Sequence, residues 1–146
     1  MNAAPNPWLL LGALLSALAA SLHLAIIVKG GPWYRFFGAG EEMARMAEAG
    51  HWYPTVLTAS IAVVLGLWSA YALAGAGWLI SPTGLPWIRT GLCLITAIYL
   101  LRGLAIVPLQ WLAPAQVTPF LVWSSVVCVG YGLVHGVGLV QVWERL

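Results

Sequence analysis

Four long apolar stretches constrain this chain more than any other feature of its sequence. They cover residues 8–28, 55–77, 87–107 and 120–143. A helix needs roughly 20 mainly apolar residues to cross the hydrocarbon core of a bilayer, and each stretch passes that test. We therefore predict an all-α, polytopic membrane protein, built as a four-transmembrane-helix bundle.

The composition supports a membrane protein and excludes several other classes. Hydrophobic residues make up 62% of the 146 residues and charged residues only 7%, with a mean hydropathy of +0.92. Soluble domains carry about a quarter charged residues, so ten charges are too few to cover a water-soluble fold. At this length we expect one domain, residues 1–146. The scattered net charge of +2 predicts no nucleic-acid partner. Cys93 and Cys128 lie in apolar runs and are expected to be free thiols.

Tryptophan positions agree with four spans, because these rings collect at the two membrane interfaces. With the helices threaded up and down, the face that carries the N-terminus (side A) receives Trp8, Trp78, Trp87 and Trp143. The opposite face (side B) receives Trp33, Trp52, Trp111 and Trp123, and only Trp68 falls inside a span. Lysine and arginine are more frequent on side B, which favours side B in the cytoplasm and both termini outside.

Small residues recur at every fourth position of three spans and predict close helix packing. These stripes are Gly12, Ser16 and Ala20 in the first span, Thr58, Ala62, Gly66, Ala70 and Ala74 in the second, and Ser124, Cys128, Gly132 and Gly136 in the fourth. The first span also contains a small-x-small triplet at residues 17–19, the pattern of a signal-peptide cleavage site. Because no basic residue precedes Lys29, we expect an uncleaved span.

The connection between the first two spans, residues 29–54, holds six of the ten charged side chains, five of them within residues 30–54. Within it, Gly40 and Gly50 bracket the short segment EEMARMAEA, whose two leading glutamates suit the positive end of a helix dipole. Glu41 and Arg45 are also four residues apart, in the favourable order. We predict an interfacial amphipathic hairpin between helices 1 and 2. It is either a surface hairpin or a functional lid.

Ionisable residues inside a span are costly and mark functional sites. Arg102 lies about 9 Å before Pro108 along the third span, and no span contains an acidic residue. We predict that Arg102 pairs with a glutamate of the hairpin; the alternative is an arginine that extends to the headgroups. The predicted site at the side-B mouth comprises His23, Arg35, Glu41, Glu42, Arg45, His51, Tyr99 and Arg102.

A second polar cluster is predicted in the other half of the bundle, from Ser69, Tyr71, Arg89 and His135. His135 is expected to hydrogen-bond across helices, with a ligand role as the alternative. His23 and His135 differ in depth by about 15 Å, which disfavours a bis-histidine haem. We predict no cofactor and no metal site, and the sequence leaves the catalytic residues, if any, unknown.

Three segments carry a resemblance to a known group of proteins: HLAIIVKGGPWYRFFGAGE, GHWYPTVLTASIAVVLGLWSAYALAGAG and IRTGLCLITAIYLLRGLAIVP. Over nearly its full length the chain resembles small, uncharacterised four-span inner-membrane proteins of proteobacteria. The resemblance implies a multi-pass protein of the bacterial inner (cytoplasmic) membrane and implies no activity. Small multidrug exporters also have four helices, but they depend on a glutamate in the first helix, where this chain has His23.

These observations favour a non-enzymatic integral membrane protein that binds a lipid-like ligand or a membrane partner at the side-B mouth, where cations suit an anionic head. Expected partners are membrane lipid and, alternatively, a second copy of the chain or another membrane protein. One alternative is an intramembrane enzyme acting on a lipid or quinone, with His23 or His51 as base and a glutamate orienting it. Another is a small transporter.

Overall fold

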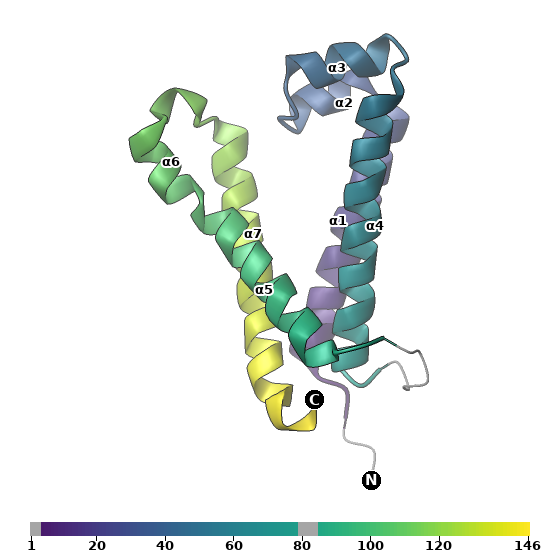
Figure 1. Cartoon of the computed structure of the whole chain (residues 1–146), viewed down its shortest axis with the longest axis vertical. Helices are drawn as coiled ribbons and strands as arrows, with labels where there is room; N and C mark the ends of the chain where they lie inside the picture. Colours follow the sequence, from purple (N-terminus) through teal and green to yellow (C-terminus); the bar gives the residue numbers. More distant parts are fainter. Residues whose placement is uncertain (1–3, 79–84) are drawn as a thin grey trace. The chain divides into compact units, whose positions relative to one another are not determined.

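The computed structural model describes residues 4–78 and 85–146, and these residues are helical with short connections (Figure 1). The elements in chain order are α1 (Pro7–Lys29), α2 (Gly31–Phe36), α3 (Glu41–Glu48), α4 (Trp52–Gly75), α5 (Ile88–Leu104), α6 (Ile106–Leu112), η1 (Pro114–Gln116), α7 (Pro119–Val142) and η2 (Trp143–Arg145). The connection between the second and third predicted spans lies largely outside the described residues, at residues 79–84.

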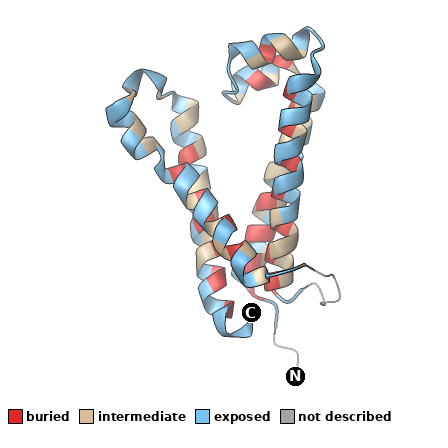
Figure 2. Ribbon diagram, viewed as in Figure 1, coloured by how far each residue is buried: buried red, intermediate tan, exposed pale blue. Residues whose placement is uncertain are grey.

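Four helical segments are long and apolar enough to cross a membrane: Pro7–Lys29, Trp52–Gly75, Ile88–Leu112 and Pro119–Arg145. Each overlaps one predicted span. Their outer surfaces carry many exposed leucine, valine, isoleucine and tryptophan side chains (Figure 2). Water disfavours apolar surface on this scale, whereas hydrocarbon accepts it. The predicted fold class, all-α with four transmembrane helices, is confirmed.

The third span is interrupted at Ala105, between α5 and α6, two residues earlier than the predicted end of the span. Pro108 has no backbone N–H, so the carbonyl of Leu104 receives no helical bond from it and the helix is broken there. The next span begins at a regular cap. The hydroxyl of Thr118 accepts the backbone N–H of Leu121 at 3.1 Å, and proline follows the cap at the first helical position.

The chain divides into two compact units, residues 17–67 and the remainder, with α1 and α4 running from one into the other. The remainder, unit 1, contains the start of α1, the end of α4, and α5 and α7, so four helices meet there. Its core includes Leu9, Leu92 and Val142, which are almost fully buried. Glycines let these side chains reach neighbouring backbones. A Cβ on Gly138, for example, would lie 2.7 Å from the side chain of Leu9.

The predicted packing stripes hold only in part. Gly12 and Ser16 of α1 and Gly132 of α7 are buried, as a packing role requires. On α4, however, Gly66 is exposed and a Cβ there would touch nothing within 4 Å. A strict spacing of four drifts around a helix of 3.6 residues per turn. The buried face of α4 instead alternates steps of three and four residues, through Thr58, Ala62, Leu65, Ser69 and Ala72.

Unit 2, residues 17–67, combines the end of α1 and the start of α4 with α2 and α3, which lie across those ends (Figure 1). The amphipathic helix predicted between Gly40 and Gly50 is α3. A small core of Ile26, Tyr34 and Ala44 joins α1, α2 and α3. The hydroxyl of Tyr34 donates to the carbonyl of Pro54 and lies 3.0 Å from the Thr58 hydroxyl, which ties α2 to the start of α4.

Candidate functional site

Arg35 of α2 is the centre of a charge cluster in the hairpin. Its Nε and Nη2 donate to the two carboxylate oxygens of Glu41 at 2.8 and 2.9 Å. Its Nη1 and Nη2 also donate to the carboxylate of Glu48, at the other end of α3. Gly31 makes this possible, because a Cβ at that position would collide with the Glu48 carboxylate. One guanidinium therefore holds both ends of α3.

The charge cluster combines two arginines with three glutamates, so it keeps one excess negative charge. Hydrogen bonds from Arg35 hold the pKa of Glu41 and of Glu48 below the usual range of a glutamate, and the same bonds raise the pKa of Arg35. Arg45 adds longer contacts, 3.8 Å to Glu41 and 3.7 Å to Glu42. These side chains are largely exposed, so solvent screens each pair and its net stabilisation is small. The cluster organises the hairpin locally.

Arg102 bonds to two serines of α7. Its Nη1 donates to the Ser125 hydroxyl at 3.3 Å and its Nη2 to the Ser124 hydroxyl at 3.2 Å, both on α7. The glutamates predicted to pair with it are bonded to Arg35 and Arg45. Each group thus has partners within its own unit, and the Arg102–glutamate pair stays a prediction.

Tyr99, which the sequence places at the side-B mouth with Arg102, lies in the core of unit 1. Its hydroxyl is 3.0 Å from the Ser16 hydroxyl of α1, and its ring packs edge-on against Trp68 and Tyr131. Tyr99 and Arg102 lie three residues apart on one face of α5, but the Tyr99 hydroxyl meets Ser16 of α1 whereas the Arg102 guanidinium bonds to α7. The site thus loses Tyr99 and gains two serines that the prediction omitted.

His135 is fully buried in unit 1, where its ring lies against Gly12 of α1. Its Nδ1 is 2.8 Å from the carbonyl oxygen of Tyr131, one turn back on α7, so Nδ1 carries the proton and donates. The predicted bond across helices is therefore wrong. Within the described residues its Nε2 has no hydrogen-bond partner. The ring is held by its own helix and by packing against glycine.

The other two histidines do not form the base–carboxylate pair that the enzyme alternative needs. The Nδ1 of His23 contacts the carbonyl oxygen of Ala19 at 2.8 Å, again one turn back on its own helix. His51 is exposed after α3, and no hydrogen bond or ion pair joins it to a glutamate among the described residues. The carboxylates of the hairpin instead form ion pairs with Arg35 and Arg45.

The second predicted cluster consists of separate contacts. Ser69 donates to the carbonyl of Ala13 at 2.8 Å and ties α4 to α1. Tyr71 donates to the carbonyl of Pro86 at 3.3 Å. Arg89 donates to the carbonyl of Trp143 at 2.9 Å and stacks over its ring at 4.7 Å. Each of these bonds lies at a different helix end or helix–helix contact. Among the described bonds, none links these four residues directly.

The sequence analysis missed Asn6 and Gln141, which join three helices of unit 1. The Oδ1 of Asn6 caps α1 by accepting the backbone N–H of Leu9 at 2.9 Å. Its backbone N–H donates to the carbonyl of Ala76 after α4, and its Nδ2 donates to Oε1 of Gln141 on α7 at 2.8 Å. The sequence does contain a signal for the capping role of Asn6. Asparagine followed by proline is a common helix start, and Asn6–Pro7 stands at the start of the first span.

The chain matches no known protein family, no curated protein and no solved structure. What the fold defines is a class: four apolar helices of spanning length, apolar outer surfaces and charge gathered near helix ends. The protein is a multi-pass integral membrane protein.

Proposed function

We propose that the protein is a non-enzymatic integral membrane protein of the bacterial inner membrane that binds a lipid-like ligand with an anionic head at Arg102. The observation that carries the proposal is the bonding of that arginine. Both of its hydrogen bonds go to neutral hydroxyls, and within the described part of its own unit no carboxylate pairs with it. Within the described part of its own unit, the charge is oriented by two hydroxyls and has no counter-ion.

The energetics favour an anion at this position. An arginine at the centre of a span costs about 2.5–3.5 kcal/mol in insertion, less near the headgroups. Serine hydroxyls orient a guanidinium, but they carry no net charge to offset its own. A phosphate oxygen pair matches the fork of the guanidinium and forms short, charge-assisted bonds. The present bonds of 3.2 and 3.3 Å lie at the long end of the usual range.

The depth of Arg102 suits a lipid head. It lies in the last turn of α5, about 9 Å before Pro108, so its long side chain reaches the headgroup level. Two exposed tryptophans, Trp111 of α6 and Trp123 of α7, flank this end of the helix pair. Exposed tryptophans are typical of the membrane interface. The proposed site is therefore Arg102 with Ser124 and Ser125, at one membrane surface.

The experiment is native mass spectrometry of protein purified in a mild detergent, with lipids identified after release. Wild-type protein should retain anionic phospholipid. Arg102→Gln should lose most of it, and Arg102→Lys should retain an intermediate amount, because lysine keeps the charge without the fork. Arg89→Gln is the matched control on the same helix, since Arg89 already has a carbonyl and a ring as partners.

Circular dichroism and thermal unfolding of all four proteins check that each is folded. The same lipid complement in wild type and Arg102→Gln contradicts the proposal. Loss of a bound protein chain, rather than of lipid, in Arg102→Gln identifies an acidic membrane partner in place of the lipid.

A further inference from the structure

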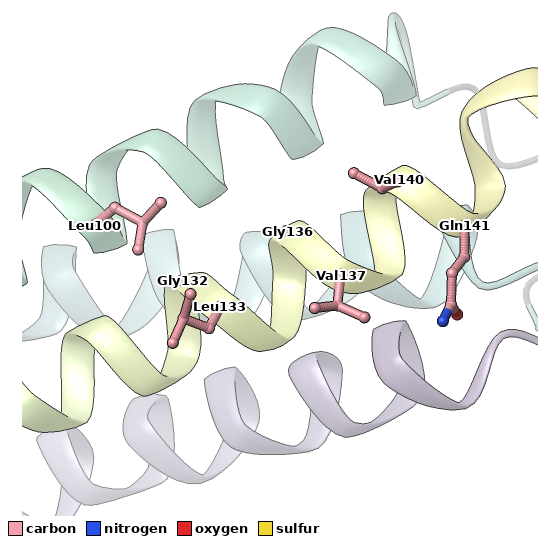
Figure 3. Close-up of a pocket in the computed structure, with 7 residues that line it drawn as sticks. All are labelled: Leu100, Gly132, Leu133, Gly136, Val137, Val140 and Gln141. Carbon is pink, nitrogen blue, oxygen red and sulfur yellow. The ribbon is translucent and has the colours of Figure 1, made fainter.

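A shallow apolar groove of about 520 Å³ runs along α7 in unit 1, farther toward the C-terminal end of that helix than Ser124 and Ser125 (Figure 3). It is lined by Leu100 of α5 and by Gly132, Leu133, Gly136, Val137, Val140 and Gln141 of α7. Two glycines form its floor and leave room that larger side chains would fill. Six of the seven lining residues have no polar side-chain atom, so the groove selects a hydrocarbon occupant.

Gln141 stands at one end of the groove, and its orientation follows from a chain of hydrogen bonds. The backbone N–H of Leu9 requires an acceptor, which fixes the amide oxygen of Asn6 on that side. The Asn6 nitrogen must then donate, so the atom of Gln141 that meets it is the amide oxygen. The nitrogen of Gln141 is left with two N–H donors and no partner among the described residues. The groove therefore ends at an uncharged donor.

From the groove and its donor we propose that this face binds one acyl chain of a membrane glycerolipid, with the ester carbonyl of that chain at Gln141. The distance from Gly132 to Gln141 is about 14 Å along the helix. That is close to half of a hydrocarbon core of about 30 Å, which is the depth of one leaflet. Gln141 lies one residue before the end of α7, where a lipid ester is expected.

This proposal goes beyond the proposed function and does not depend on it. The Arg102 site selects by charge, whereas the groove offers a neutral amide and an apolar channel. It should therefore take zwitterionic and anionic glycerolipids equally well. Its preference should be for an ester over an ether linkage, because a carbonyl oxygen is the stronger acceptor.

The test is photo-crosslinking in vesicles of dioleoyl phosphatidylcholine doped with the same lipid carrying a diazirine in one chain, followed by peptide mapping. We expect labelling of Leu133, Val137 and Val140 several-fold above that of Val63 on α4, which is 72% exposed and does not line this groove. Labelling in proportion to exposure alone, equal on both helices, overturns the proposal, because it is the result of ordinary solvating lipid.

Further variants and a diether lipid test the role of Gln141 and the position of the acyl chain. Gln141→Glu keeps the acceptor for Asn6 but removes the free N–H donors, so groove labelling should fall about two- to tenfold, the range of one net hydrogen bond. The diether analogue of the lipid should show a similar fall with wild-type protein and no further fall with Gln141→Glu. Val137→Trp should block the groove, and Val63→Trp should leave it unchanged.

Unchanged labelling in Gln141→Glu and with the diether lipid removes the ester from the proposal. Arg102→Gln should leave groove labelling as in wild type. The two proposals therefore fail independently.

Discussion

The two units of this protein differ in how their polar side chains are solvated and hydrogen-bonded. In unit 2 charged side chains lie outside the apolar part, and Arg35 gathers two carboxylates around itself in an exposed cluster. In unit 1 the buried polar groups are neutral, and hydroxyls, an amide and an imidazole bond to each other or to carbonyls between packed helices. The difference follows from solvation, since an ion is tolerated where water reaches it and a neutral group where it does not.

If this comparison is correct, unit 1 should be sensitive to volume and unit 2 to charge. The largest expected loss of stability therefore comes from adding a methyl group to the core of unit 1. Gly12→Ala places a Cβ 2.9–3.1 Å from three ring atoms of His135, a fully buried side chain that has no free direction in which to move. Overpacking of this kind costs about 1–3 kcal/mol.

Thermal unfolding in mild detergent should show a clear loss of stability for Gly12→Ala. The matched control is Gly66→Ala on α4, where the added Cβ touches nothing within 4 Å. That change should be neutral or slightly stabilising, because alanine favours a helix over glycine by about 1 kcal/mol. Equal effects of the two substitutions would mean that helix propensity, and not contact with His135, decides the outcome.

A smaller effect is expected where unit 2 is tied together by a neutral hydroxyl. Tyr34→Phe removes the donor to the Pro54 carbonyl and the contact with Thr58, while the ring keeps its place in the small core of unit 2. One such bond is worth about 1 kcal/mol. Hydrogen exchange of residues 31–50 should become faster. Phe36→Leu, at a ring that is 75% exposed, is the control and should leave the exchange unchanged.

The sequence predicts the spans well because length and polarity decide them, and each overlaps a described helix. It also locates α3, since Gly40 and Gly50 bracket it with positive φ values of 97° and 75°. It does not by itself decide which side chains meet. Arg102 was paired with the glutamates on charge alone, although Arg35 lies only six residues before Glu41 and closes a much shorter loop.

Side-chain direction explains the errors of the site prediction. Depth along a helix follows from residue number, but the face depends on rotation of 100° per residue and on the neighbours that cover it. Tyr99 was given the right helix, but its hydroxyl meets Ser16 of α1 rather than the partners of Arg102. His135 was given the right burial and the wrong partner, because histidine can satisfy itself on the carbonyl one turn back, which no spacing reveals.

The smallest and most specific effect should be a loosening of the hairpin of unit 2 at low pH. Because Arg35 lowers the pKa of Glu41 and Glu48 below their unfolded value of about 4.3, the bonds stabilise the hairpin fully above that pH. The stabilisation is lost as the pH falls through the lower, folded pKa. A spin label at Ala39, in a protein with Cys93 and Cys128 replaced by serine, should gain mobility only below about pH 4.

The comparison between arginines decides whether this acid response belongs to the Arg35 cluster. Arg35→Gln should give a label that is mobile at every pH, because its bonds to both ends of α3 are gone. Arg45→Gln should keep the acid transition, since its contacts of 3.7 and 3.8 Å lie on the exposed face of α3. A transition that persists in Arg35→Gln would assign the pH response to another group. Unit 2 would then depend on packing, as unit 1 does, and the contrast between them would disappear.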